Sequence, residues 1–326
     1  MIFRMKTKNF KDQNRTVGFE IEFQGLTPEK TANLIVDCLD GDVEKISDAC
    51  FKVDSQYGEF KVETDAKLLK ELAQSSEKNI KVKKFDFEGV IKDILEPITQ
   101  ELVPTEIVSP PLEEENFNII KKIEESLHDA GARGTNESAY FAFAMQFNPE
   151  ITSKESSYIL SVLRSYILLS SWLQSQIDIG LTRELTGYVD DFPNDYAEIV
   201  LDQDYHPDLS KLIDDYLEYN PTRNRGLDFL PLFLYLDEER VRNVVTDERV
   251  KARPTFHYRL PSCQLGLESW NIFVEWKRWC LLERIANDKE IISKMSKSFI
   301  DLYHDSNLSF EKKWLRLCNH YVEDFR

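Results

Sequence analysis

The stretch Val17-Gly18-Phe19-Glu20-Ile21-Glu22-Phe23 alternates large apolar side chains with Gly or Glu. Successive side chains of a β-strand point to opposite faces, so the four apolar residues share one face and Glu20 and Glu22 share the other. Two strand residues on one face lie roughly 7 Å apart. Like charges at that spacing favour a shared counter-ion. The stretch therefore predicts a strand with one packed face and one acidic face.

Three further stretches, residues 59–65, 140–148 and 255–260, show the same alternation. Their polar positions carry acids, amides, His257 and Arg259. An antiparallel sheet with one packed and one solvated face also produces this pattern, so the alternation alone leaves the role of the polar face open. The sequence predicts an α+β protein built on an antiparallel sheet.

Apolar residues at helical spacing predict the remaining elements, and Thr27 is suited to cap the first of them. The expected helices cover residues 28–39, 90–94, 113–130, 156–177, 209–219, 230–235, 270–286 and 310–320. We expect one domain over residues 1–326. Residues 181–253, rich in Asp, Pro, Asn and Arg, are predicted to form an insertion or lid within it.

Composition narrows the classes of partner. The 326 residues include 58 acidic and 41 basic side chains, a formal charge of −17 that repels nucleic acid and anionic membranes. The five cysteines form no CxxC pair, so we expect reduced, mostly buried thiols. The first ten residues are charged where a signal peptide is apolar, so we expect a cytoplasmic protein without membrane attachment.

The polar positions of the strands suggest a divalent-metal site. Glu20 and Glu22 offer hard oxygen ligands, which suit Mg²⁺ or Mn²⁺. Further candidates on the predicted polar face are Glu106, Gln146, Asn148 and His257. Arg259 lies two residues after His257 and is placed to bind a phosphate through two of its guanidinium nitrogens.

Several common catalytic motifs are missing from the sequence. There is no GxxxxGK[ST], GxGxxG, HExxH or GxSxG pattern. A nucleotide would therefore have its phosphates held by metal ions and arginine on an open sheet.

Four motifs and one connecting segment resemble a known family. They are VGFEIEF (17–23), EIVSPP (106–111), QFNPE (146–150), YNPTRNRGLD (219–228) and RPTFHYRLP (253–261). In this order they resemble the putative amidoligase family of the carboxylate–amine ligase superfamily, which includes glutamine synthetase and glutamate–cysteine ligase. The resemblance implies a curved antiparallel sheet that holds ATP and two or three divalent metals on one face, with helices packed behind.

Carried over residue by residue, the resemblance implies metal ligands at Glu20, Glu22 and Glu106, and a phosphate-binding role for Arg259. The sequence also departs from related enzymes. Where glutamine synthetase relatives carry a His-x-His signature, this chain has Ala144 and Gln146; Gln146 and Asn148 are then expected to contact metal or nucleotide. Where relatives carry Glu-x-Arg, it has His257-Tyr258-Arg259, so His257 is expected to replace a carboxylate metal ligand.

The chemistry implied is ATP-dependent amide formation through an acyl phosphate, from a small-molecule or peptide carboxylate and an amine or ammonia. Arg259 and Glu106 would be catalytic. Arg223 and Arg225 would close over the phosphates or bind an anionic substrate, unless they are surface arginines paired with nearby aspartates.

Two other functions remain open from the sequence. One is a catalytically inactive member of the same fold that binds a nucleotide or another ligand. The other is a glycoside hydrolase that uses Glu20, Glu22 or Glu63 as paired carboxylates. The oligomeric state and the identity of the substrates are not encoded in any recognisable pattern.

Overall fold

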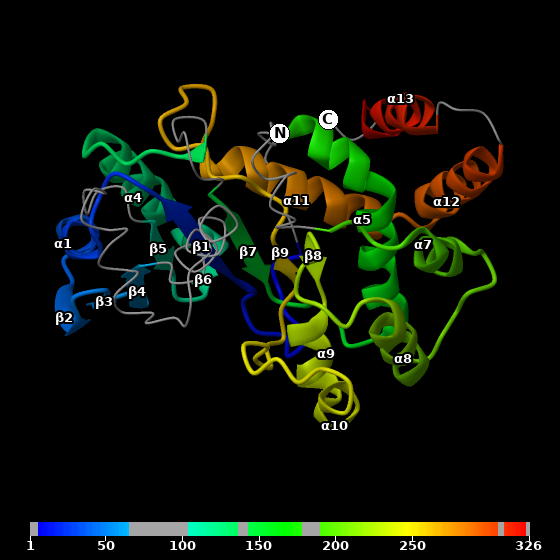
Figure 1. Ribbon diagram of the computed structural model, residues 1–326, viewed down its shortest axis with the longest axis horizontal. Coiled ribbons are helices and arrows are strands. Elements are labelled where there is room, and N and C mark those ends of the chain that lie inside the picture. The colour runs from blue at the N-terminus through cyan, green and yellow to red at the C-terminus, as the bar shows by residue number, and fades with distance from the viewer. Residues whose placement is uncertain (1–5, 65–103, 136–142, 178–189, 306–309, 324–326) are drawn as a thin grey trace, which may run out of the picture. The chain divides into compact units, whose positions relative to one another are not determined.

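The computed structural model describes residues 6–64, 104–135, 143–177, 190–305 and 310–323. The chain is a mixed α/β protein that divides into two compact units. Unit 1 comprises residues 1–17, 146–261 and 273–326, and unit 2 comprises residues 18–145 and 262–272. Strands β1 (Thr16–Phe23) and β7 (Met145–Pro149) and helix α11 (Ile272–Ala286) each contribute residues to both units (Figure 1).

Unit 2 is built on an open antiparallel sheet. Its strands run in the order β2 (Asp42–Ser47), β3 (Cys50–Ser55), β4 (Gly58–Thr64), β5 (Thr105–Val108) and β1, and the short β6 (Leu112–Glu113) pairs with β1. In β1 the apolar positions are buried, as the alternation in the sequence predicts. The predicted antiparallel pairing is thus confirmed, whereas a glutamine-synthetase-like arrangement stays a prediction.

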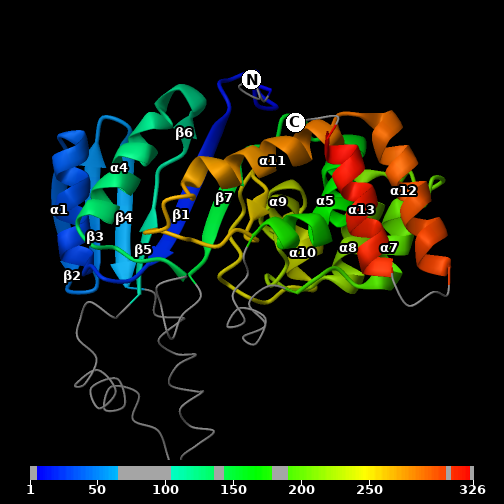
Figure 2. The ribbon, with the colours of Figure 1, turned by 90° about the horizontal axis from the view of Figure 1, so that it is seen from above.

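Helices cover the apolar face of this sheet. Figure 2 shows α1 (Pro28–Leu39) and α4 (Asn118–Asp129) side by side along strands β3 and β4. Thr27 caps α1 as predicted, because its hydroxyl oxygen accepts a hydrogen bond from Lys30 N at 3.2 Å. A short 3₁₀ turn, Glu114–Asn116, precedes α4. With one face packed against helices, the opposite face carries the polar side chains of the strands.

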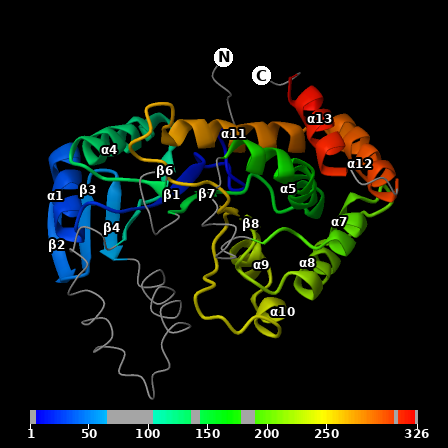
Figure 3. The same ribbon diagram turned by 45° about the horizontal axis from the view of Figure 1, so that its top comes forward.

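Unit 1 contains a small antiparallel set of strands and most of the helices (Figure 3). The strands run β7–β9–β8, with β9 at His257–Tyr258 and β8 at Leu227–Asp228. The helices are α5 (Ser156–Gln176), α7 (Asn194–Leu201), α8 (Leu209–Tyr219), α9 (Leu230–Leu236), α10 (Glu238–Arg242), α12 (Lys289–His304), α13 (Phe310–Glu323) and the greater part of α11.

Aromatic rings form the core of unit 1. Tyr258 of β9 is fully buried and lies 6.3 Å from Phe147, 6.4 Å from Tyr166 and 5.4 Å from Trp279, measured between ring centroids. Because Tyr258 points into this core, its chain neighbours His257 and Arg259 are directed to the opposite side of the strand.

Some sequence-based predictions were incomplete. The elements that were not expected are strands β2, β3, β6 and β8 and helices α7, α10 and α12. The last predicted strand, 255–260, is reduced to the two residues of β9. The helix expected at 90–94 and the start of the strand expected at 140–148 lie outside the described residues. Within the described ranges, no helix combines the length and apolar character that a bilayer span requires.

Candidate functional site

Three glutamates line up across the sheet of unit 2. Glu22 of β1 lies directly opposite Glu106 of β5, and Glu106 lies directly opposite Glu63 of β4. Residues directly opposite one another share a face of the sheet, with Cβ atoms about 4.5–5.5 Å apart. We call Glu22, Glu106 and Glu63 the acidic row. Glu20 shares its face, two residues before Glu22 on β1.

The carboxylates of the acidic row already have partners. Glu22 is buried, and its Oε2 accepts a hydrogen bond from Ala144 N at 2.9 Å. Glu63 Oε1 forms an ion pair with Lys61 Nζ at 2.6 Å. Among the residues described, no three His, Cys, Asp or Glu side chains are arranged so that they could hold a metal ion. The row therefore supplies carboxylates of the right chemistry on one face, but not a preformed metal centre.

A hydrogen-bonded polar chain lies on β7 and β9 of unit 1. Gln146 Nε2 is 2.7 Å from Asn148 Oδ1 and 3.0 Å from His257 Nδ1. Gln146 and Asn148 share a face because they are two residues apart on β7. The structure thus brings together three of the predicted site residues.

Three arginines act electrostatically on His257. Burial first, and then the guanidinium groups of Arg259, Arg223 and Arg253 in that order, together lower the pKa of His257 to about 3. We call these three arginines the cationic cluster. Arg223 is itself partly buried, and desolvation lowers its pKa, with a further contribution from Arg259. In a chain with a charge of −17, these arginines make a locally positive region, and positive regions attract anions.

Asp228 is an acidic partner of this cluster that the sequence analysis did not single out. It lies opposite His257 in the pairing of β8 with β9, it is fully buried, and its Oδ2 is 4.0 Å from Arg259 Nη1. Burial raises the pKa of Asp228 to about 6, and the positive charge of Arg259 opposes that rise. In the sequence, Asp228 is one of many acids, and only the pairing of β8 with β9 identifies it.

Arg225 is held in a different environment from Arg223. Its Nε donates to Asn220 Oδ1 at 2.9 Å, its other nitrogens reach the carbonyl oxygens of Asp191 and Tyr219, and its guanidinium lies over the ring of Phe192. These contacts position the segment around Asn220 within unit 1. In the structure the Arg225 side chain therefore contacts the protein itself, and its expected role in binding phosphate stays a prediction.

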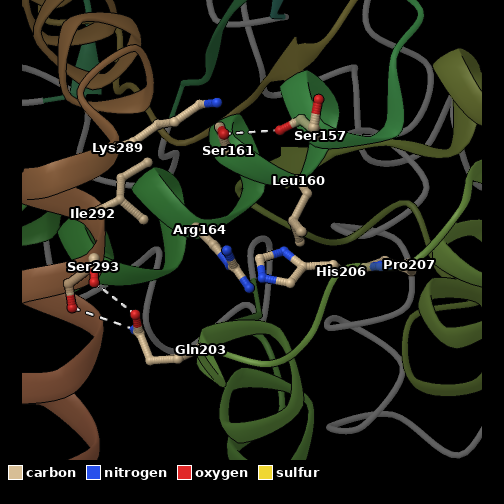
Figure 4. A pocket seen from close by; sticks show the side chains of 10 residues that line it. All are labelled: Ser157, Leu160, Ser161, Arg164, Gln203, His206, Pro207, Lys289, Ile292 and Ser293. Carbon is tan, nitrogen blue, oxygen red and sulfur yellow. Dashed lines mark hydrogen bonds between the residues drawn. The ribbon is translucent and has the colours of Figure 1, made fainter.

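A cavity of about 430 Å³ opens elsewhere in unit 1 (Figure 4). It is lined by Ser157, Leu160, Ser161 and Arg164 of α5, by Gln203, His206 and Pro207 between α7 and α8, and by Lys289, Ile292 and Ser293 of α12. Its arginine donates to the backbone carbonyl oxygens of residues 200, 202 and 205. None of the predicted site residues lines it.

The predicted residues therefore fall into two groups. Glu20, Glu22 and Glu106 belong to unit 2, whereas the amides, His257 and the arginines belong to unit 1. Glu63 joins the first group and Asp228 the second. The lid role predicted for residues 181–253 stays a prediction; the part of it from residue 190 onward is described and belongs to unit 1.

Comparison with known proteins identifies the family. No curated protein matches the chain. The sequence profile described as "putative amidoligase enzyme" matches residues 13–281, which include every residue of the acidic row and of the cationic cluster. The match covers most of the chain, and it agrees with the four ordered motifs. The chain belongs to the putative amidoligase family, whose name denotes a ligase-type enzyme.

Proposed function

We propose that this protein is an ATP-dependent carboxylate–amine ligase that works through an acyl phosphate. Membership of the amidoligase family supports a ligase. The observation that carries the proposal is the cationic cluster, because three arginines of a strongly acidic chain act together on His257. Such a cluster suits the phosphoryl group of a nucleotide.

The reaction has two steps. An oxygen of the substrate carboxylate attacks the γ-phosphorus of ATP, the bond to ADP breaks, and an acyl phosphate forms. The nitrogen of the amine then attacks the acyl carbon, inorganic phosphate leaves, and the nitrogen loses a proton. Arg259 and Arg223 would stabilise the charge on the transferring phosphoryl group, which is where electrostatic catalysis contributes most.

The acidic row is the part of the chain suited to Mg²⁺ or Mn²⁺, because hard cations prefer carboxylate oxygens. Glu22 and Glu106 are the proposed ligands, with Glu20 beside them on β1. When bound, the metal would neutralise phosphate charge. Glu63 is a weaker candidate because it pairs with Lys61.

Calorimetric titration of ATP, with and without Mg²⁺, tests the proposal. We expect binding that requires Mg²⁺ and that Arg259→Ala and Glu106→Gln each weaken at least tenfold. Matched controls are Arg316→Ala and Glu115→Gln, which make the same changes at exposed positions of the same units and should bind as the wild type does.

Phosphate release from ATP is then measured with a panel of carboxylates and amines. Phosphate release that requires both a carboxylate and an amine supports the proposed ligase activity. If ATP binds but no pair of carboxylate and amine releases phosphate, the protein is instead a non-catalytic nucleotide-binding protein. The presence of His257 where related enzymes carry a carboxylate is the observation that motivates this alternative. The absence of any nucleotide binding would refute both.

A further inference from the structure

His257 has a buried nitrogen, Nε2, that no group within the described part of the chain satisfies. Its Nε2 makes no hydrogen bond to any of the described residues. A buried donor or acceptor without a partner loses its hydrogen bond to water and gains none in return, so native proteins rarely keep one without a reason. Nε2 therefore marks a place for a bound ligand.

The hydrogen bonds of Gln146 determine which nitrogen of His257 carries the proton. The amide nitrogen of Gln146 donates to Asn148 Oδ1 at 2.7 Å and faces His257 Nδ1 at 3.0 Å. An N–H can only donate, so Nδ1 must accept and must be unprotonated. The proton of the neutral ring is then on Nε2, which becomes a hydrogen-bond donor and has no lone pair to offer a metal.

The charges around His257 also disfavour a cation. Burial, and after it the charges of the three arginines of the cationic cluster, lower the pKa of His257, so the ring is neutral at physiological pH. The same guanidinium groups would repel a divalent ion about twice as strongly as a single charge. Asp228, when ionised, offsets part of this positive charge.

We propose that His257 binds a phosphoryl oxygen as a neutral hydrogen-bond donor through Nε2–H, and that it is not a metal ligand. The identity of the anion as a phosphoryl group rests on the proposed function. Gln146 is then a positioning residue, because its amide holds the His257 ring in the tautomer that can donate.

The first test measures binding of inorganic phosphate and of Mn²⁺, each without nucleotide, to the full-length protein. His257→Leu removes the donor at similar size and should weaken phosphate binding about tenfold. His257→Gln keeps an N–H near the position of Nε2 and should stay within about threefold of the wild type. His320→Leu, at an exposed histidine of the same unit, should change nothing. Neither His257 variant should change Mn²⁺ affinity.

His257→Glu separates the two roles directly. A carboxylate at this position repels phosphate, so phosphate binding should be lost. If His257 were a metal ligand, His257→Leu would lose Mn²⁺ binding and His257→Glu would restore it, and that result would overturn the inference. Phosphate binding by His257→Leu equal to the wild type would overturn it as well.

Nuclear magnetic resonance of the wild type tests the tautomer without relying on a variant's folding. Long-range ¹H–¹⁵N correlations of the histidine rings, assigned with His257→Gln, should show His257 protonated on Nε2 at neutral pH; protonation on Nδ1 would contradict the inference. These measurements use neither ATP nor a carboxylate. If phosphate binding depends on His257 but the ligase assay shows no activity, the proposed function is refuted and the inference about His257 stands.

Discussion

Glu124 of α4 gives the sharpest prediction about stability. Its side chain is buried, with 7 % of the residue exposed, and its two oxygens lie 3.2 and 3.3 Å from Ile272 N, the first residue of α11. Burial raises the pKa of Glu124 to about 7, against an ordinary value of 4.5, although the hydrogen bond from Ile272 opposes the rise. The folded protein therefore binds a proton that the unfolded chain has already lost.

The sign and size of the change in unfolding free energy with pH follow from the difference between the pKa of Glu124 in the folded and in the unfolded state. Below pH 4.5 the carboxyl is protonated in both states and costs nothing. As pH rises from 4.5 to 7 the unfolded chain loses its proton while the folded state keeps it, so the free energy of unfolding falls, and it levels off above pH 7, where the carboxyl is ionised in both states. From the two pKa values, the cost is about 1 kcal/mol at pH 5 and about 3 kcal/mol at pH 8.

Glu124→Gln removes the charge and keeps an oxygen that can accept from Ile272 N–H. We expect the variant to be more stable than the wild type by about 1 kcal/mol at pH 5 and about 3 kcal/mol at pH 8. Urea unfolding followed by far-ultraviolet circular dichroism at pH 5, 6, 7 and 8 measures the difference. Glu115→Gln, at an exposed glutamate of the same unit, is the control and should follow the wild type at every pH. A stability difference for Glu124→Gln that does not change with pH would refute the reasoning.

Three further predictions concern other parts of the chain. Arg15 and Glu283 form a buried ion pair, so Arg15→Met should lower the free energy of unfolding by about 3–5 kcal/mol, and adding Glu283→Met should recover most of that loss. Urea unfolding measures both variants, and equal losses in the single and the double variant would contradict the prediction. Gly25 and Gly131 both have positive φ, but a Cβ at Gly25 would lie 2.5 Å from Gly131 O whereas one at Gly131 meets nothing within 4 Å. Gly25→Ala should therefore cost more thermal stability than Gly131→Ala, and equal melting temperatures would argue against that contact. Iodoacetamide followed by peptide mapping should alkylate the partly exposed thiols of the folded protein before the buried ones, with Cys38 and Cys50 ahead of Cys263, Cys280 and Cys318.

The elements that the sequence predicted are those governed by local patterns. The alternation in residues 17–23 predicts β1 because burial of one face needs only the period of a strand. The cap at Thr27 predicts the start of α1 because the hydrogen bond spans three residues. By contrast, every residue of β2 is exposed, and its pairing with β3 is interrupted by a register shift after Lys45. Such a strand has no apolar alternation, so its conformation comes from pairing alone.

The candidate site divides in the same way. Glu20, Glu22 and Arg259 were identified as polar positions on strands, and the family motifs singled out the same residues. The acidic row depends on register between strands that lie far apart in the sequence, so Glu63 became its third member only in the folded sheet.

Neighbouring arginines show most clearly what sequence leaves undecided. Arg223 and Arg225 are two residues apart and look equivalent in the sequence. In the structure the positive charge of Arg223 lowers the pKa of His257, whereas Arg225 is hydrogen-bonded to Asn220 and to backbone carbonyl oxygens. Likewise, the tautomer of His257 depends on Gln146, 111 residues earlier in the chain. The sequence by itself determined the family, the main strands and the chemical types of the site residues, because these follow from short-range patterns. Only the tertiary structure decided which charges meet, because that depends on strand register and on the burial of each side chain.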